Sequence, residues 1–253
     1  MTTDDHRLAA DLAAQAGQLL VDLRTDGLSA GALRKTGDRR SHEFLSAELA
    51  RLRPGDAVLS EEGRDNPVRL TADRVWIVDP LDGTREFGEP GRTDWAVHVA
   101  LWERGRLAAG AVALPAEGQV LATVDPPARP TVAAGQQKLR VAVSRTRPPA
   151  FLERLSETID MITIPMGSAG AKAAAVMRGE ADVYVHSGGQ HEWDSAAPAA
   201  VALAAGLHAS RIDGAALVYN QPDPVLPDIL ICPVAFAGSL LDAIAAAHGP
   251  RLT

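Results

Sequence analysis

The sequence at residues 76–85 is Trp-Ile-Val-Asp-Pro-Leu-Asp-Gly-Thr-Arg, and the rest of the chain is best interpreted around it. The apolar run that ends at Val78 predicts a buried strand. Pro80 cannot donate a ladder hydrogen bond, so we expect the strand to end there. Gly83 and Thr84 then predict the start of a helix. This order places two carboxylates beside free backbone N–H groups, an arrangement that suits a cation and a phosphate.

Composition narrows the class of protein. The chain has 253 residues, of which 46% are hydrophobic, so it can bury a core as one large domain or two small ones. Its formal net charge is -7 and it has no long basic run, which argues against a nucleic acid polymer as partner. A small phosphorylated ligand needs only a local site and remains open.

Cysteine usage and hydropathy indicate a compartment. The single cysteine, Cys232, excludes an internal disulfide and fits a reducing environment. The polar N-terminus lacks the features of a signal peptide. No run approaches the roughly 18 apolar residues that a transmembrane helix needs. We therefore expect a cytoplasmic protein with no transmembrane segment.

The first half of the chain predicts two helices followed by strands. Helical spacing of apolar residues covers 4–24 and about 39–52, and residues 31–38 are expected to form a loop. After strands at 57–59 and 75–78, an antiparallel meander is predicted over 95–102, 107–114 and 119–124. The Pro-, Ala- and Gly-rich stretch at 125–137 predicts a boundary between an N-terminal half, 1–130, and a C-terminal half, 138–253.

The second half alternates strands and helices, which predicts a sheet covered by helices and an α/β (α+β) fold class. The expected strands are 139–143, 162–164, 182–185 and 229–232, and the expected helices are 149–158, 167–177, 192–205 and 236–247.

Four carboxylates occupy positions that a solvated surface explains poorly: Glu61, Asp79, Asp82 and Asp194. Helix capping is an alternative for Asp82 and Asp194. Asp79 ends an apolar strand and needs a partner that offsets its desolvation. Clustered carboxylates raise one another's pKa unless a cation lies among them. Because all the ligands are oxygens, Mg²⁺ or Mn²⁺ is favoured over zinc.

Two such cations, about 3.5–4 Å apart, suit in-line hydrolysis of a phosphate ester. The N–H groups at Gly83 and Thr84 are placed to hold phosphate oxygens, and the Thr84 hydroxyl to orient the attacking water. The alternative is that Thr84 is an ordinary residue of a first helical turn.

Three ordered motifs resemble those of the inositol monophosphatase superfamily, whose members are lithium-sensitive, Mg²⁺-dependent phosphatases. Residues 79–84 are similar to its DP(I/L)DGT motif, residues 193–197 to its WDxAA motif, and residues 60–62 to its third motif. The sequence at residues 59–62, 85–87 and 192–194 is closer to the branch of CysQ-type 3′(2′),5′-bisphosphate nucleotidases, particularly the actinobacterial members.

The resemblance implies a layered αβαβα sandwich with the site between its halves. It assigns Glu61, Asp79 and the Leu81 carbonyl to one Mg²⁺, and Asp79, Asp82 and Asp194 to a second. Asp38 is similar to the acid that supports a third, weaker ion, and Mn²⁺ substitutes for Mg²⁺ in this scheme. Gly83 and Thr84 contact the phosphate and the water. Glu61, Asp82 and Thr84 are the expected catalytic residues.

Substrate contacts are expected from both halves. Ser144 and Arg145 resemble a nucleotide-approaching segment, in which the arginine pairs with a second phosphate. Gly167 and Ser168 resemble a substrate-contacting turn. Lys172, Glu192 and Asp194 complete the expected substrate-binding set. Ordinary surface positions for Arg145 and Lys172, and a helix-dipole role for Glu192, remain the alternatives.

The expected reaction is Mg²⁺-dependent removal of the 3′-phosphate of adenosine 3′,5′-bisphosphate in sulfur metabolism, with its 5′-phosphosulfate analogue as a further candidate substrate. A rival of the same class is an inositol monophosphatase or a fructose-1,6-bisphosphatase-like sugar phosphatase. A rival of a different class is a non-catalytic sensor of phosphorylated ligands. The sequence leaves a homodimer open.

Overall fold

Two five-stranded sheets form the frame of the computed structural model, which describes residues 4–130 and 138–248. The first sheet has the order β1-β2-β3-β4-β5. Its strands β1 and β2 are parallel, and the others form the antiparallel meander that the sequence predicts. The bounds are β1 Ala57–Ser60, β2 Arg74–Asp82, β3 Ala96–Glu103, β4 Arg106–Leu114 and β5 Gln119–Ala122.

The second sheet has the order β7-β6-β8-β10-β9. Strand β6 runs parallel to both of its neighbours, whereas β10 is antiparallel to β8 and β9. The bounds are β6 Leu139–Ser144, β7 Met161–Met166, β8 Val183–Ser187, β9 Leu207–Ser210 and β10 Asp228–Pro233.

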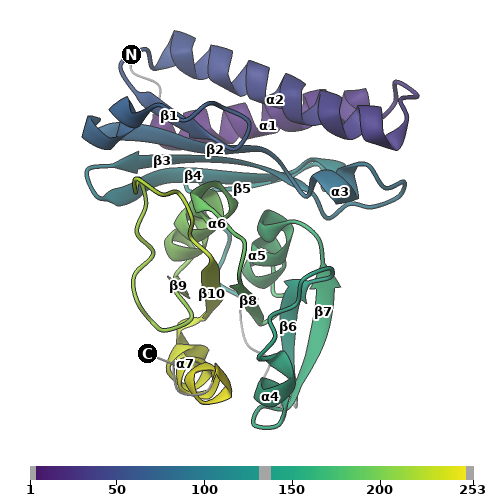
Figure 1. Cartoon of the computed structure of the whole chain (residues 1–253), viewed down its shortest axis with the longest axis vertical. Coiled ribbons are helices and arrows are strands. Elements are labelled where there is room, and N and C mark those ends of the chain that lie inside the picture. Colours follow the sequence, from purple (N-terminus) through teal and green to yellow (C-terminus); the bar gives the residue numbers. More distant parts are fainter. Residues whose placement is uncertain (1–3, 131–137, 249–253) are drawn as a thin grey trace.

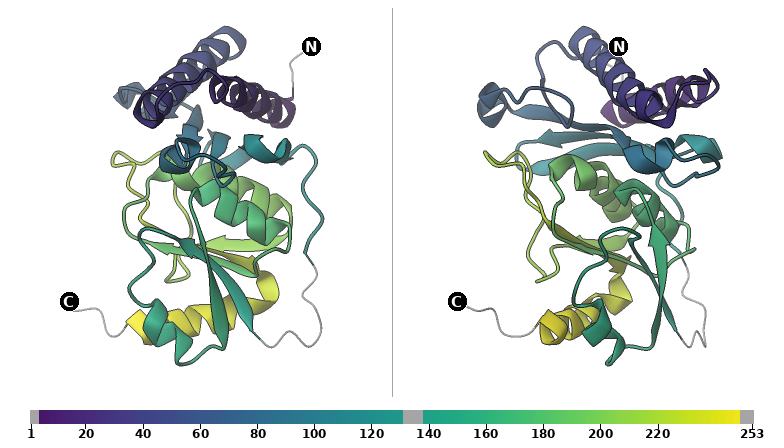
Figure 2. Two further views of the ribbon diagram at one scale, coloured as in Figure 1. Left: turned by 90° about the vertical axis from the view of Figure 1, so that its right-hand side faces the viewer. Right: turned by 45° about the vertical axis from the view of Figure 1, so that its right-hand side comes forward.

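Helices separate and cover the two sheets, giving the expected αβαβα layers (Figure 1). Helices α1 and α2 cover the outer face of the first sheet, α5 and α6 lie between the sheets, and α4 and α7 lie side by side on the outer face of the second (Figure 2). The bounds are α1 Asp5–Leu23, α2 Ala30–Leu52, α3 Thr84–Phe87, α4 Leu152–Ser156, α5 Ala169–Met177, α6 Glu192–Ala204 and α7 Val234–His248, with short 3-10 helices η1 Pro67–Thr71 and η2 Pro115–Glu117.

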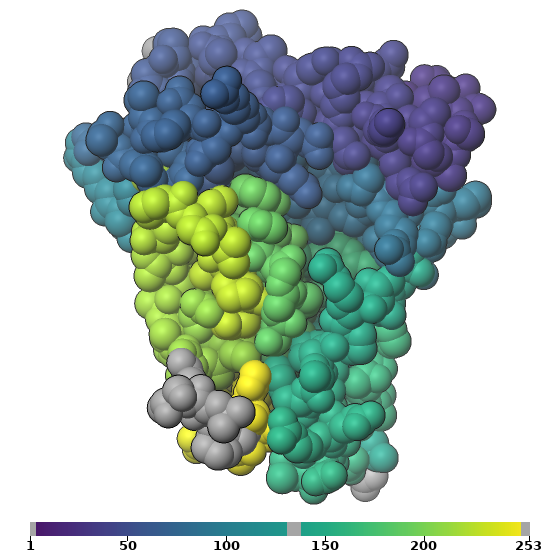
Figure 3. All heavy atoms as spheres, viewed as in Figure 1, coloured from purple at the N-terminus to yellow at the C-terminus, as the bar shows by residue number. Residues whose placement is uncertain are grey.

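Three hydrophobic cores fill the spaces between these layers. In β3, Val97 and Val99 face α1 and α2, as the alternation of the sequence predicts, while Ala96 and Ala100 face α5 and α6. The middle core is rich in alanine, and the two outer cores carry more of the leucines. In the space-filling view, the first sheet and its helices lie across the top, with the rest of the chain beneath (Figure 3).

Two local expectations are wrong. Residues 31–38 do not form a loop, because α2 begins at Ala30, where the Ser29 hydroxyl accepts a hydrogen bond from the Ala32 N–H. Strand β2 does not end before Pro80. It continues to Asp82 through a register shift between Asp79 and Asp82, so Pro80 lies at an irregularity that requires no ladder donor.

Smaller differences concern element ends and one missed strand. Strand β9 was not expected from the sequence, because it is a four-residue edge strand with mixed burial. His186 belongs to β8 rather than to the loop that follows it. Residues 131–137 of the predicted boundary lie outside the described residues. No helix among those described is long and apolar enough to cross a membrane.

Gly110 of β4 tests the tightness of the middle core. A β-carbon at this position would lie 2.6 Å from the Ala200 β-carbon on α6. Gly110→Ala should therefore lower the free energy of unfolding by about 1–3 kcal/mol, because one of the two layers must shift. Chemical denaturation measures this loss.

Gly31→Ala is the matched control. Gly31 lies in the first turn of α2, and a β-carbon added there would meet nothing within 4 Å. This change should leave stability unchanged or raise it by up to about 1 kcal/mol, because alanine favours helix. Equal stability of Gly110→Ala and the wild type would contradict the close packing of β4 against α6.

Candidate active site

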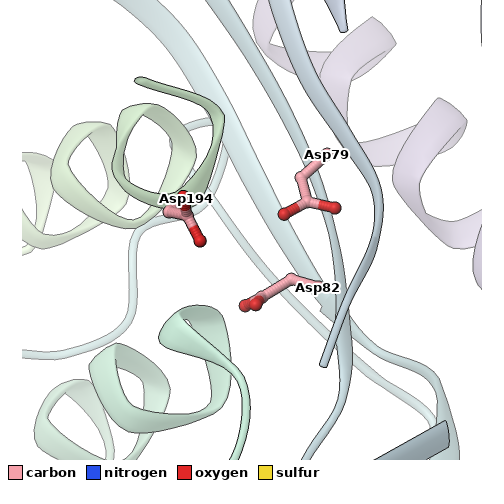
Figure 4. Close-up of side chains that lie close together, drawn as sticks. All are labelled: Asp79, Asp82 and Asp194. Atoms are coloured by element: carbon pink, nitrogen blue, oxygen red, sulfur yellow. The ribbon is translucent and has the colours of Figure 1, made fainter. Parts of the chain in front are cut away.

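Three aspartates from distant parts of the chain meet at one point. Asp79 and Asp82 extend from the end of β2, and Asp194 lies in the first turn of α6 (Figure 4). One carboxylate oxygen from each lies within 4.8 Å of the others. They line a cavity of about 430 Å³ that also includes Glu61, which follows β1. The structure thus brings together all four carboxylates that the sequence singles out.

Asp82 is held by groups from other elements. Its Oδ2 atom accepts hydrogen bonds from the Ser168 hydroxyl at 2.5 Å and from the Gly170 N–H at 2.7 Å, and the His98 Nε2 atom lies 3.2 Å away. Burial alone would raise the pKa of Asp82, but His98, Lys172 and Ser168 together lower it. Asp82 is therefore ionised, and its Oδ1 atom is left for another ligand.

The other three carboxyls resist ionisation. Burial and the neighbouring carboxylates raise the pKa of Asp79 well above its ordinary value, that of Asp194 to about 6 and that of Glu61 to about 7. Beyond burial, charge repulsion from Glu61 raises the pKa of Asp79, which favours retention of a proton between these neighbouring carboxyls. A divalent cation in place of that proton would satisfy the whole group.

The turn after β2 is fixed from both sides. The Asp79 carboxylate accepts a hydrogen bond from the Leu81 N–H at 3.1 Å, and the Pro80 carbonyl accepts one from the Ser41 hydroxyl on α2 at 2.7 Å. Gly83 has a φ of +84°, in the left-handed region that favours glycine. These contacts orient the Leu81 carbonyl and place Thr84 at the start of α3.

Asp38 and Thr84 contact each other. The Thr84 hydroxyl lies 3.1 Å from Asp38 Oδ1 and 3.0 Å from the Leu81 carbonyl, so its single proton points to one of these two acceptors. Burial raises the pKa of Asp38 to about 6. Helix α2 approaches this turn closely because residue 37 is glycine, where a β-carbon would lie 2.7 Å from Phe87 Cε1. Asp38 lies outside the group of three aspartates.

The turn before α5 uses its side chains to support Asp82. Ser168 Oγ accepts a hydrogen bond from the Ala171 N–H at 2.9 Å while it donates to Asp82. The Lys172 ammonium donates to the carbonyls of Gly167 and Ser168. Burial lowers the pKa of Lys172 to about 8. Gly167, Ser168 and Lys172 line the cavity, but the described polar contacts of Ser168 and Lys172 are made to the protein.

Arg145 and Glu192 differ from their expected positions. Arg145 does not line the cavity, and its guanidinium pairs with Glu86 at 2.5 Å and Glu89 at 2.7 Å. Glu192 is 1% exposed and accepts hydrogen bonds from the Asn220 and Gln221 N–H groups, each at 2.7 Å. Each side chain connects two segments of the protein. Ser144 does line the cavity.

Several cavity residues were not identified from the sequence as site residues: Glu86, Arg147, His186 and Gln190 line it, and His98 supports Asp82 from behind. The alternation of β3 offered a signal for His98, because it is the partner of Asp79 in the ladder. Glu86 in α3, His186 in β8 and the loop residues Arg147 and Gln190 gave no comparable signal, since their neighbours are distant in the sequence.

Comparisons with known proteins agree with this geometry. The sequence profile of the inositol monophosphatase family matches residues 7–247. The chain is 53% identical over 252 residues to a 3′-phosphoadenosine 5′-phosphate phosphatase from Mycobacterium leprae, covering 95% of this chain and 93% of that protein. It is 32% identical over 201 residues to the 3′(2′),5′-bisphosphate nucleotidase CysQ of Escherichia coli K12, covering 75% and 80%.

The fold has a similar match among solved structures. Inositol monophosphatase II of Staphylococcus aureus superposes with a TM-score of 0.81 at 20% identity, covering 96% of each chain. At this identity the likeness concerns the fold, and it confirms the layered arrangement that the sequence predicts.

Cation binding at the acidic cluster should release protons. Glu61 and Asp194, with pKa values raised to about 7 and about 6, hold protons at mildly acidic pH that a divalent cation must displace. Affinity for Mg²⁺ should therefore rise as pH increases through this range and weaken as pH falls through it. Calorimetric titration at about pH 6 in two buffers of different ionisation enthalpy counts the protons.

The protons released by Glu61 and Asp194 should decrease in number above about pH 8, where these two carboxyls are already ionised. Asp11→Asn, at an exposed position of α1, is the control and should leave the proton count unchanged. Binding at about pH 6 without proton release would show that the carboxyls are not ligands.

Proposed function

The chain belongs to the inositol monophosphatase family, and we propose that it hydrolyses the 3′-phosphate of adenosine 3′,5′-bisphosphate to give AMP and inorganic phosphate. The observation that carries the chemistry is the convergence of Asp79, Asp82 and Asp194 on one point. The choice of substrate is supported by the names of the Mycobacterium leprae and Escherichia coli relatives. Hydrolysis of the 5′-phosphosulfate analogue belongs to the same proposal.

Members of this family are metal-dependent, and the residues present fit a divalent cation. The site offers carboxylate oxygens and the Leu81 carbonyl, with no cysteine or histidine among the proposed ligands, which favours Mg²⁺, with Mn²⁺ as a substitute. We assign Glu61, Asp79 and Leu81 to one ion and Asp79, Asp82 and Asp194 to another. Asp38 would support a third through Thr84. Sensitivity to lithium, which the family resemblance implies, stays a prediction.

A bound divalent cation lowers the pKa of a water ligand and neutralises charge on phosphate oxygens. The protein's own groups then direct the water. Glu61 lines the same cavity, and its carboxylate, ionised once a cation is bound, would accept the proton of that water. Since the Thr84 hydroxyl donates to Asp38 or Leu81, its oxygen lone pairs remain to accept a hydrogen bond from that water.

Substrate contacts are proposed from both halves of the chain. Gly83 and Thr84 line the cavity beside the acidic cluster and would contact the scissile phosphate. Gly167, Ser168 and Ser144 form part of the opposite side. Lys172 would act on the phosphate through its positive charge, because its ammonium already donates to two carbonyls. As the bond between phosphorus and the 3′-oxygen breaks, the oxygen of water replaces the sugar oxygen on phosphorus, and the 3′-oxygen takes up a proton from solvent to leave as the hydroxyl of AMP.

A sugar or inositol phosphatase is the second candidate, because the acidic cluster would serve either substrate and a solved inositol monophosphatase shares the fold. A sensor without activity is disfavoured. It would not need a carboxyl and a threonine hydroxyl in one cavity, where together they can direct a water molecule.

Three expectations from the sequence stay predictions: a functional division into halves 1–130 and 138–253, a homodimer and a cytoplasmic location. The cavity supports the division into two halves, because some of its lining residues come from 1–130 and the others from 138–253.

A substrate panel tests the proposed function. We expect kcat/KM for adenosine 3′,5′-bisphosphate to exceed that for inositol 1-phosphate and fructose 1,6-bisphosphate by at least about tenfold, because additional contacts to the nucleotide contribute in the transition state. Phosphate release at saturating Mg²⁺ measures each value. A preference for inositol 1-phosphate would favour the second candidate instead.

Asp82→Asn tests the acidic cluster. The amide oxygen can still accept from Ser168 and Gly170, but the amide nitrogen that replaces Oδ1 cannot bind a cation. Turnover should fall by more than about 100-fold while the fold is retained. Phosphate release, Mg²⁺ titration and a thermal melt would be compared.

Glu62→Gln is the matched control, because Glu62 is exposed and adjacent to Glu61 but does not line the cavity. It should retain activity close to the wild type. Full activity of Asp82→Asn would show that the assignment of ligands is wrong.

A further inference from the structure

Two buried hydrogen-bond acceptors in the cavity wall have no partner in the described part of the chain: His186 Nδ1 and Gln190 Oε1. The two residues are 3% and 5% exposed. Buried acceptors without a donor are rare in folded proteins, because each loses its hydration without compensation. A pair of them in one cavity indicates a ligand that brings hydrogen-bond donors.

The tautomer of His186 follows from its other nitrogen. Nε2 lies 2.7 Å from the Gly188 carbonyl, which can only accept, so Nε2 carries the hydrogen. Burial lowers the pKa of His186, so the ring is neutral and Nδ1 has a free lone pair. In Gln190 the Nε2 atom donates to the Tyr184 hydroxyl at 2.8 Å, and Oε1 is left over.

A positively charged side chain, Arg147, lies in the same cavity as these acceptors. No carboxylate of the described residues pairs with its guanidinium, in contrast to Arg145. Its Nη1 atom would lie only 2.9 Å from a β-carbon at residue 189, so the glycine there, with a φ of +72°, gives the guanidinium room. Arginine presents paired donors that match a phosphate, so this position suits a second anionic group.

The position of this wall relative to the acidic cluster selects the ligand. His186 and Gln190 line the same cavity as Asp82 and Asp194, so this wall faces the space in which the scissile phosphate would bind. The group nearest that phosphate in a substrate is the sugar that carries it. In adenosine 3′,5′-bisphosphate the one free sugar hydroxyl is at the 2′ position, adjacent to the 3′-phosphate.

We propose that Arg147, His186 and Gln190 form a second subsite, in which Arg147 binds the 5′-phosphate and the two buried acceptors receive the 2′-hydroxyl. This assignment rests on the proposed function, and each residue binds a stated part of the substrate. It also moves the role that the sequence suggested for Arg145 to Arg147. The acidic cluster binds the scissile phosphate, and this subsite selects a ribonucleoside that carries a second phosphate.

The arm for Arg147 compares two substrates that differ by one phosphate. The ratio of kcat/KM for adenosine 3′,5′-bisphosphate to that for adenosine 3′-monophosphate should fall about 10- to 100-fold in Arg147→Ala, mainly through KM. Arg147→Lys should retain part of the preference, because it keeps the charge but loses the paired donors.

Arg85→Ala is the matched control. Arg85 is an exposed arginine that lines the same cavity from α3, beside the acidic cluster. Its loss should affect both substrates alike and leave the ratio unchanged. A ratio that falls in Arg85→Ala but not in Arg147→Ala would overturn the assignment.

The arm for the acceptors removes the hydroxyl from the substrate. Wild-type kcat/KM should be about tenfold lower for 2′-deoxyadenosine 3′,5′-bisphosphate, because the buried acceptors would be left unpaired. His186→Phe and Gln190→Leu remove one acceptor each. In at least one of them the two substrates should become nearly equal, with a thermal melt confirming that the variant is folded.

An unchanged preference for the 2′-hydroxyl in both folded variants would overturn this part of the proposal. The proposed function fails separately, if the wild type does not hydrolyse the bisphosphate, and the subsite falls with it. If the wild type hydrolyses it and the ratio is the same in Arg147→Ala, the function stands and the subsite is wrong.

Discussion

The hydrogen bonds that hold the Asp82 carboxylate are the interaction on which the site depends. One carboxylate oxygen receives the Ser168 hydroxyl and the Gly170 N–H from the second half of the chain, beside His98 from the first sheet. These groups stabilise the charge of a nearly buried carboxylate. They also fix the distance between β2 and α5. The same few hydrogen bonds therefore settle the charge of Asp82 and the spacing of β2 and α5 at the cavity.

Glycines in the turn before α5 and in its first turn let the backbone come close enough to Asp82 to form these hydrogen bonds. A β-carbon at Gly170 would collide with His98, and one at Gly167 would collide with Glu86. Glu86 in turn pairs with Arg145, and Asp94 accepts a hydrogen bond from the Gly167 N–H at 2.6 Å. Charged side chains from the first half thus enclose the turn that supports Asp82. Residues that the sequence suggested as ligands of substrate hold this turn in place.

The sequence predicted the parts of the site that are local. A carboxylate at the end of an apolar strand needs a partner wherever the chain goes, so Asp79, Asp82 and the strands around them could be anticipated. The protein contacts of Arg145 and Glu192 and the helix over residues 31–38 were not anticipated, and the reason is common to them. Arg145 pairs with Glu86 and Glu192 accepts from Asn220, and both partners lie far away in the sequence. Residues 31–38 contain glycines that suggest a loop, but Gly37 instead lets the helix pack closely on Leu81.

The alanine-rich middle layer has a consequence for how such a protein diverges. Helices α5 and α6 form an alanine-rich spacer between the sheets, and how closely α6 packs on the first sheet sets the gap between Asp82 on β2 and Asp194 on α6. A lineage can exchange leucines in the two outer cores with little effect on that gap. Enlargement of an alanine in the spacer, even remote from the cavity, changes the spacing of the acids. Sequence drift in this layer is therefore constrained by catalysis as well as by stability.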